Sequence, residues 1–470
     1  MIIQTILLLL AAANADKYLK LDLEFEGMNY VTNLEVGSEK ELVTLQIDTG
    51  SSDTWVKTSQ STNNTNNDKY FHINNSETFH SNDTNFKMVY GSGYGEYVNG
   101  TWGTDNFFVN DTLLGNMTFA VVGDTSQHFG LLGLGLPECE STYYHINDGS
   151  QYMYNNFPMK LVENGIIDRN LYSIYLDQDY GHGELLFGAI DNNKFDGKIY
   201  KFPLVNGNSL VGIKNISAIT ITLNEISILN LEDDEKIPVA EGYMSALLDT
   251  GVTNAMLPKS ILEKIANELN LDYDSEANIY TAECSKLDNK LFEFNFQGVN
   301  FSVPILDFAY MHDNQKLCGL PITETYMQQF IALGQSFLDS IYMVVDLDSE
   351  SVALANAVFP SNESDIIVLE NGIEDIENLK TPPDSITYDL QHMIYSTLNE
   401  TIKTNFDQHS TYHKKSIINS KSVAPSTSLI SLSTSSSYSL IESIAKVSNN
   451  AGNTSNSRCF TWIWMILSLL

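Results

Sequence analysis

Short stretches of apolar residues, many of them alternating with polar ones, recur between residues 16 and 358, and segments rich in Gly, Asn and Asp separate them. A period of two is typical of strands that bury one face. Clear examples are Tyr18–Phe25, Thr44–Ile47, Phe107–Val109, Tyr172–Leu176 and Phe292–Phe296. Short helices are predicted over Pro158–Asn164 and over Ser260–Leu269, where apolar residues recur three or four apart. The pattern therefore predicts a mostly β fold with little helix.

The character of the chain changes after Pro360. Residues 361–380 are acidic, two prolines follow, and residues 409–457 are rich in Ser, Thr and Asn. Such a composition lacks the periodic apolar face that a packed element needs. We therefore predict that residues 359–450 form a stalk that is acidic at first, then flexible and open to O-glycosylation.

Both ends of the chain are apolar, and both runs are too short to cross a bilayer as a helix. Residues 1–15 end in small side chains, which predicts a secretory signal peptide. Residues 451–470 combine a polar spacer with an apolar end, which predicts a GPI-attachment signal with Asn450 as the acceptor; a frayed apolar terminus is the alternative. Glycosylation sequons crowd residues 63–116, as in a secreted glycoprotein. We expect attachment to the cell surface or cell wall.

The charge balance is strongly acidic, with 25 Lys and Arg against 59 Asp and Glu and a formal net charge of −34. Nucleic acid is therefore excluded as an expected partner, because phosphate binding needs basic patches and the sequence has none. Two interpretations of the acidity remain. It serves solubility or work at low pH, or it attracts cationic peptides to a cleft.

Four cysteines are present, and by themselves they allow three pairings. Cys459 lies in the segment that the anchor signal would lose, so Cys284 and Cys318 form a natural pair in an oxidising compartment, with Cys139 left over. No Cys-x-x-Cys or His/Cys spacing suggests a metal site, so neither a metal nor another cofactor is expected.

Two segments of the chain carry the same short motif. Asp48 and Asp249 each begin an Asp-Thr-Gly sequence directly after an apolar strand, and each opens a similar half of the chain. One copy alone is a weak signal, but a repeat in the same context indicates two duplicated lobes. A pair of unrelated turn aspartates is the alternative.

The chemistry of these residues suits a symmetric site. Gly50 and Gly251 permit close backbone approach, and Thr49 and Thr250 can hydrogen-bond across a two-fold interface. If the lobes face each other, the two carboxylates come close and share one proton. The ionised carboxylate then takes a proton from water while the protonated one donates to a substrate carbonyl. The pattern predicts Asp48 and Asp249 as the catalytic pair, with Ser51 as a further supporting donor.

These motifs resemble the two active-site sequences of pepsin-like aspartic proteases, over about residues 16–358. The resemblance implies a two-lobed fold with lobes at residues 16–200 and 201–358 and the active site in the cleft between them. It implies that Tyr90 and Gly91 form the tip of a flap over the substrate and that Trp55 is the hydrogen-bond partner of the tyrosine. It also places Cys284 and Cys318 at the disulfide of the second lobe.

Other stretches, such as Asn156–Pro158 and Gly183–Asp191, resemble fungal yapsins and barrier pepsins. The resemblance implies a secreted, monomeric endopeptidase that acts on peptides or proteins, with cleavage at basic residues if it is yapsin-like. A pheromone-degrading protease of the barrier-pepsin type and a catalytically weak peptide-binding wall protein are the alternatives. Because side chains alternate along a strand, Gln46 and Leu247 are expected to line the pocket beside the scissile bond.

Four features depart from the family pattern. Only about thirty residues separate Ala15 from Asp48, so no pro-segment is expected, and no cysteine lies between Ser51 and Tyr90 for a disulfide in the first lobe. Gln335 stands where an acidic residue is usual. Val252 stands where a hydroxyl residue usually bonds the second aspartate. None of these departures removes a catalytic carboxylate.

Overall fold

The computed structural model describes the greater part of the chain up to Tyr388. The described ranges are 17–59, 69–90, 96–143, 152–177, 181–211, 213–275, 279–312, 316–320, 322–325, 330–359 and 363–388. The predicted signal peptide, the Ser/Thr-rich part of the stalk, the anchor signal with Asn450 and the flap residue Gly91 all lie outside these ranges.

Strands dominate the described residues, as the alternating pattern predicts. The first half of the chain contributes β1 (Leu19–Glu26), β2 (Asn29–Val36), β3 (Glu41–Asp48), β4 (Trp55–Lys57), β5 (His80–Tyr90), β6 (Glu96–Val109), β7 (Thr112–Thr125), β8 (Gly130–Gly133), β9 (Leu171–Asp177), β10 (His182–Phe187), β11 (Ala189–Asp191) and β12 (Phe195–Pro203). The second half contributes β13 (Thr220–Asn230), β14 (Glu235–Leu248), β15 (Ala255–Pro258), β16 (Asp272–Asp274), β17 (Ile279–Glu283), β18 (Lys290–Phe296), β19 (Val299–Pro304), β20 (Tyr310–His312), β21 (Leu317–Leu320), β22 (Ile322–Thr325), β23 (Phe330–Leu333), β24 (Ile341–Asp346), β25 (Ser351–Ala357), β26 (Ile366–Val368) and β27 (Leu379–Lys380).

The helices are short and few within the described ranges. They are α2 (Phe157–Glu163), α3 (Lys259–Leu269), α4 (Cys284–Leu287), α5 (Ile305–Phe308) and α6 (Gln335–Leu338), with 3-10 turns η1 (Ile73–Asn75), η2 (Pro137–Cys139), η4 (Asn192–Lys194), η5 (Gly207–Val211) and η6 (Ile373–Asp375). Both predicted helices are confirmed to within one residue at each end. Asn156 caps α2 by accepting from the Met159 amide, and α3 ends where Asn270 adopts the left-handed conformation.

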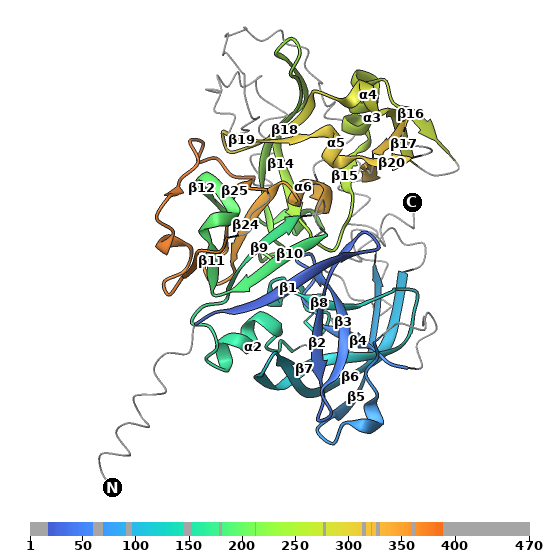
Figure 1. Cartoon of the computed structure of the whole chain (residues 1–470), viewed down its shortest axis with the longest axis vertical. Helices are drawn as coiled ribbons and strands as arrows, with labels where there is room; N and C mark the ends of the chain where they lie inside the picture. The colour runs from blue at the N-terminus through green and yellow to red at the C-terminus, as the bar shows by residue number, and fades with distance from the viewer. Residues whose placement is uncertain are drawn as a thin grey trace.

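Two groups of strands face each other, and a shared sheet joins them. In Figure 1, strands β2 to β7 form the lower body, β13 to β19 the upper body, and β1, β9, β10 and β24 lie between them. A 14-stranded sheet runs from β5 of the lower body to β27 beside β12, because β9 pairs antiparallel with both β10 and β24. A 7-stranded sheet forms the upper body. The mostly β, two-lobed architecture is therefore confirmed.

The alternation seen in the sequence is the physical basis of the sheets. In β1, Leu19, Leu21 and Leu23 are buried, while Asp22 and Glu24 on the opposite face are exposed. Buried side chains from both halves form one continuous apolar core. The two lobes therefore do not have separate cores, and the boundary predicted between residues 200 and 201 falls inside β12.

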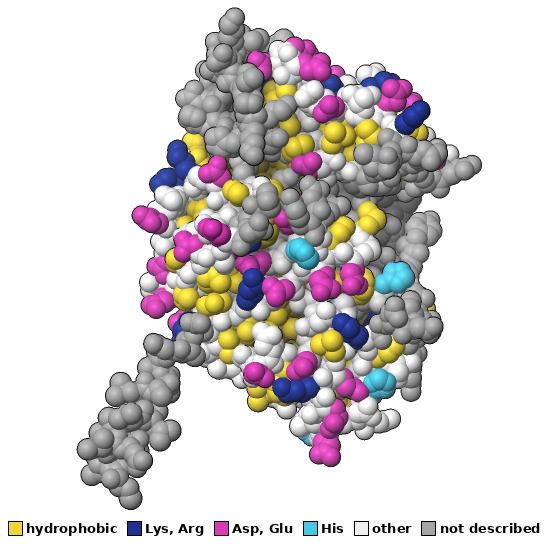
Figure 2. All heavy atoms as spheres, in the orientation of Figure 1, with side chains coloured by type: hydrophobic (Ala, Val, Ile, Leu, Met, Phe, Trp, Pro, Cys, Tyr) yellow, Lys and Arg dark blue, Asp and Glu magenta, His cyan; other side chains and the backbone are white. Residues whose placement is uncertain are grey.

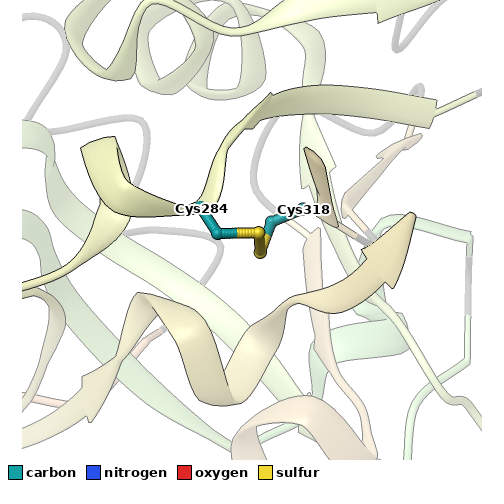
Figure 3. Close-up of a disulfide and its surroundings, with 2 residues drawn as sticks. All are labelled: Cys284 and Cys318. Atoms are coloured by element: carbon teal, nitrogen blue, oxygen red, sulfur yellow. A yellow bond between two sulfur atoms is a disulfide. The ribbon is translucent and has the colours of Figure 1, made fainter. Parts of the chain in front are cut away.

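A disulfide joins Cys284, at the start of α4, to Cys318 on β21, with their Cα atoms 5.0 Å apart (Figure 3). The bond closes a segment of 34 residues next to α3 and β17. Cys139 is disulfide-bonded as well. The expectation that Cys139 is left over is therefore wrong.

The beginning of the predicted stalk is folded. In residues 363–388, which we call the C-terminal strap, β27 pairs with β12 at the edge of the 14-stranded sheet, and β26 forms a separate two-stranded sheet with β11. The strap then reaches the upper body, where the Tyr388 amide donates to the Thr222 hydroxyl over 2.7 Å. Its apolar residues are sparse, although Leu369, Ile373 and Ile376 are buried, which is why periodicity alone did not identify it. The folded body thus continues past the predicted boundary at residue 358.

No helix within the described ranges is long and apolar enough to cross a membrane.

The strap generates a stability prediction. Ile373 is completely buried in a cluster with Leu369 and Ile376, so Ile373→Ala should lower the free energy of unfolding by about 2–4 kcal/mol. Ile367→Ala is the matched control, because Ile367 lies on the same strap but is 38% exposed, and its effect should stay below about 1 kcal/mol. Urea unfolding of the whole protein measures both. Equal and small effects would mean that the strap does not contribute to the fold.

Candidate active site

Each Asp-Thr-Gly motif lies at the end of a buried strand that a parallel neighbour supports. Strand β3 ends at Asp48 and pairs in parallel with β8, and β14 ends directly before Asp249 and pairs in parallel with β23. The Leu134 amide donates to the Asp48 carbonyl over 2.8 Å, and the Asp249 amide donates to the Leu333 carbonyl over 3.1 Å. The two loops, residues 48–51 and 249–252, are therefore held rigidly by equivalent elements of the two lobes.

The two threonines bind the loops to each other. The Thr49 hydroxyl donates to the Leu248 carbonyl over 2.8 Å and accepts from the Thr250 amide over 3.0 Å. The Thr250 hydroxyl makes the mirror-image contacts, donating to the Ile47 carbonyl and accepting from the Thr49 amide, each over 3.1 Å. Because all four bonds are buried, they fix the distance between the loops without water.

The glycines allow the loops to approach each other. A Cβ atom on Gly50 would lie 2.3 Å from Asp249 Oδ2, and one on Gly251 would lie 2.4 Å from Asp48 Oδ1. No real side chain tolerates such contacts. The glycines are therefore required because each one sits directly against the carboxylate of the other lobe.

The two carboxylates differ in their hydrogen-bond donors. Asp48 accepts from the Gly50 amide over 2.9 Å and from the Ser51 hydroxyl. Asp249 accepts from the Gly251 amide over 2.8 Å. Val252 occupies the position that corresponds to Ser51, and its side chain packs against an apolar cluster instead of donating. Negative charge is therefore better stabilised on Asp48.

Burial and mutual contact shift the titration of the pair. Burial raises the pKa of Asp48, and the Ser51 and Gly50 donors oppose that rise. Burial raises the pKa of Asp249 well above its usual value, and the neighbouring Asp48 carboxylate, which is also hydrogen-bonded to it, raises it further. Two buried carboxylates in contact cannot both ionise cheaply, so the pair holds one proton over a wide pH range. Such a pair can act as acid and base at the same time.

Tyr90 lies at the end of β5, where the described part of the predicted flap stops. Its hydroxyl accepts a hydrogen bond from Trp55 Nε1 over 3.0 Å, and their rings lie 6.4 Å apart. Trp55 is buried in a cluster with Trp102 and Phe86. Tyr90 is thus held by the buried side chain of Trp55, which lies only seven residues after Asp48 in the sequence.

Gln46 and Leu247, the two predicted pocket residues, have different surroundings. Gln46 reaches across to the other lobe, where its Nε2 donates to the Gly251 carbonyl over 3.1 Å. Leu247 is completely buried in the same apolar cluster as Val252, together with Met256 and Phe330. Gln46 therefore contacts the loop that carries Asp249, whereas Leu247 lies inside an apolar cluster.

A second buried acid pair lies behind the first catalytic loop, and sequence reasoning did not identify it. Asp53 accepts from the Tyr154 hydroxyl over 2.7 Å and from the Ser141 amide over 3.0 Å. Glu140 accepts from the Tyr154 amide over 2.9 Å, and its burial raises its pKa to about 9. The only sequence signal for this pair is that Asp53 lies five residues after Asp48, within the first motif segment. The tertiary structure brings Glu140 to it from 87 residues further along the chain.

Within the described ranges, no group of three or more His, Cys, Asp or Glu side chains is arranged to hold a metal ion.

The comparisons with known proteins agree with this geometry. The model of the family described as eukaryotic aspartyl protease matches residues 29–357. The chain is 34% identical to Aspartic proteinase 3 of Saccharomyces cerevisiae over 64% of its own length and 53% of that protein. It is 32% identical to Aspartic proteinase yapsin-3 of the same yeast, over 73% of its own length and 69% of that protein.

Barrierpepsin of Saccharomyces cerevisiae is 30% identical over 72% of this chain and 62% of its own length. The chain thus spans between about half and two thirds of the length of these relatives. The family match covers β2 to β25, both Asp-Thr-Gly loops and the disulfide between Cys284 and Cys318. The chain belongs to the eukaryotic aspartyl protease family.

Proposed function

We propose that the protein is an aspartic endopeptidase in which Asp48 and Asp249 activate water against a peptide bond. The observation that carries the proposal is the buried contact between the two carboxylates, with the donors concentrated on Asp48. Membership of the aspartyl protease family supports it.

The mechanism follows from the asymmetry of the pair. Asp48, which two donors stabilise as the anion, takes a proton from a water molecule bound between the carboxylates. Asp249, which holds the shared proton, donates it to the carbonyl oxygen of the scissile bond. The C–N bond of the tetrahedral intermediate then breaks, the proton on Asp48 passes to the leaving amine, and one hydroxyl of the intermediate returns a proton to Asp249 as it becomes the carbonyl of the product acid. Tyr90, at the end of β5, covers the substrate in this proposal.

Peptides with basic residues are the proposed substrates. The net charge of −34 favours the approach of cationic chains. Acidic side chains are scattered over the face seen in Figure 2 instead of gathering in one patch, so this attraction acts at long range and does not identify a subsite. The similarity to Aspartic proteinase yapsin-3 supports this specificity, and the similarity to Barrierpepsin supports the alternative of one dedicated peptide substrate. A peptide-library digest between pH 3 and pH 7 separates these from a catalytically weak peptide-binding protein.

We further propose that the protein acts outside the cell, attached to the surface or wall through a GPI anchor at Asn450. The apolar first and last segments of the sequence support this location.

The dyad is tested by removing one carboxylate at a time. Asp48→Asn and Asp249→Asn should each lower kcat by at least about 1,000-fold, because general acid–base catalysis needs both groups. Thermal unfolding checks that each variant is folded. A variant that keeps more than a few per cent of the wild-type rate would refute the mechanism.

The missing hydroxyl at Val252 leads to a pH prediction. A hydrogen bond to a charged group is worth roughly 1.5–3 kcal/mol, and one pKa unit corresponds to about 1.4 kcal/mol. Val252→Thr adds a donor to Asp249, the carboxyl that keeps the shared proton, and therefore favours its anion and lowers the second pKa of the pair. Because the pair must keep one proton to be active, the basic limb of the kcat/KM profile should move downward by up to about 1–2 pH units.

Ser51→Ala is the control for this experiment, because it removes the hydroxyl donor from Asp48. It should move the acidic limb upward. If neither variant moves its limb of the pH profile, the side-chain donors at positions 51 and 252 do not set the pKa values of the pair.

Attachment is tested on cells that express the full chain. Phospholipase C specific for phosphatidylinositol should release the protein, and a chain that ends at Val447 should appear in the medium without treatment. Full-length protein in the medium that still contains Leu470 would exclude the anchor.

A further inference from the structure

The second catalytic loop is held by two glutamine side chains that come from different lobes. Gln335, the first residue of α6, donates from Nε2 to the Thr250 carbonyl over 2.8 Å. Gln46, on β3, donates to the next carbonyl, that of Gly251, over 3.1 Å. Both glutamines are more than nine-tenths buried. Two successive peptide groups beside Asp249 are therefore fixed by side-chain amides.

The bond from Gln335 has a direct consequence for Asp249. The Thr250 carbonyl and the Gly251 amide belong to one peptide group, and that amide donates to Asp249 Oδ1 over 2.8 Å. A chain of hydrogen bonds thus runs from the Gln335 amide through this peptide to the carboxylate. Donation to the carbonyl orients the peptide and polarises its N–H, which strengthens the donor that faces Asp249.

The first loop has no counterpart to this arrangement at the equivalent position. The Gly135 amide donates to the Ser51 carbonyl over 2.8 Å, as the Gln335 amide does to the Val252 carbonyl over 2.8 Å. Glycine therefore stands where the second lobe has glutamine. A Cβ on Gly135 would lie 2.8 Å from Ser52 Oγ, so a side chain there is excluded. The first loop instead uses the Ser51 hydroxyl, which the second loop lacks.

We propose that Gln335 is a positioning residue that fixes the Thr250–Gly251 peptide and, through it, the Asp249 carboxyl. This inference rests on the proposed peptidase function and extends it to a residue that touches neither substrate nor the reacting atoms. The chemistry of the side chain matters, because an amide donates at every pH, whereas a carboxyl in its place would donate only while protonated.

The surroundings of α6 contain several ionisable groups. Strands β15 and β23, which pack against α6, have none. The others are the dyad itself, Asp339 at the end of α6, Asp307 on α5, and Tyr342 and Asp346 on β24. Asp346 is paired with Arg169, and burial keeps Tyr342 neutral at neutral pH. A carboxyl introduced at position 335 would therefore lie beside the acidic groups of the dyad and Asp339, which favour its protonated form.

The experiment compares Gln335→Glu and Gln335→Leu with the wild type in the whole protein, by steady-state kinetics on one peptide at pH 3 and pH 6. At pH 3 the carboxyl of Gln335→Glu is protonated and can donate, so kcat should stay within about threefold of the wild type. At pH 6 burial beside the dyad still keeps this carboxyl protonated, as burial raises the pKa of Glu140 to about 9, so kcat should again stay within about threefold of the wild type. Gln335→Leu has no donor and should lose about tenfold in kcat at both pH values with KM nearly unchanged.

Gln297→Leu is the matched control. Gln297 is equally buried and also donates from Nε2 to a backbone carbonyl, that of Asp384 over 3.1 Å, but this carbonyl belongs to the strap. The kcat of Gln297→Leu should equal that of the wild type at both pH values. A tenfold loss of kcat in Gln297→Leu would show that the effect of Gln335→Leu is a general cost of removing a buried amide, and would overturn the assignment.

The remaining outcomes are also decisive. Wild-type kcat in Gln335→Leu, or a kcat in Gln335→Glu as low as in Gln335→Leu, would show that donation by Gln335 does not position Asp249. If Gln335→Leu does not fold, Gln335→Ala, which also lacks the donor, takes its place. An inactive wild type would instead refute the proposed function.

Discussion

The structure depends on bringing two carboxylates into contact inside a buried interface. Each of Asp48 and Asp249 would prefer water to a protein interior, and each repels the other when ionised. The arrangement persists because rigid strands hold the two loops and because buried threonine hydrogen bonds tie the loops together. The glycines then let each loop lie against the opposite carboxylate. The same close contact that makes it costly to ionise both carboxylates leaves one proton shared between them.

The two loops support their aspartates with different side chains. The first stabilises its carboxylate from outside through the Ser51 hydroxyl, whereas the second has Val252 there and fixes its backbone through the amides of Gln335 and Gln46. A duplicated backbone thus carries an asymmetric set of donors. In the proposed mechanism, that asymmetry allows equivalent aspartates to take the opposite roles of base and acid.

The lobes are joined by more than the active site. One apolar core spans both halves, the central sheet pairs strands from each, and the C-terminal strap connects that sheet, through β27, to the upper body. Such a frame limits how the lobes move relative to each other. A small change in the distance between the two loops would alter how the carboxylates share their proton, so a rigid frame keeps that arrangement in place.

The sequence by itself determined the strands, the two helices, the duplicated loops and the pair Asp48 and Asp249, because periodicity and the Asp-Thr-Gly motif are local signals. Tertiary structure decided what depends on distant contacts. It joined Gln335 to the loop at Thr250, placed Glu140 beside Asp53, and buried the strap, whose apolar residues are too sparse to form a pattern. Hydrogen bonds between residues more than 80 positions apart leave no periodic trace in a single sequence.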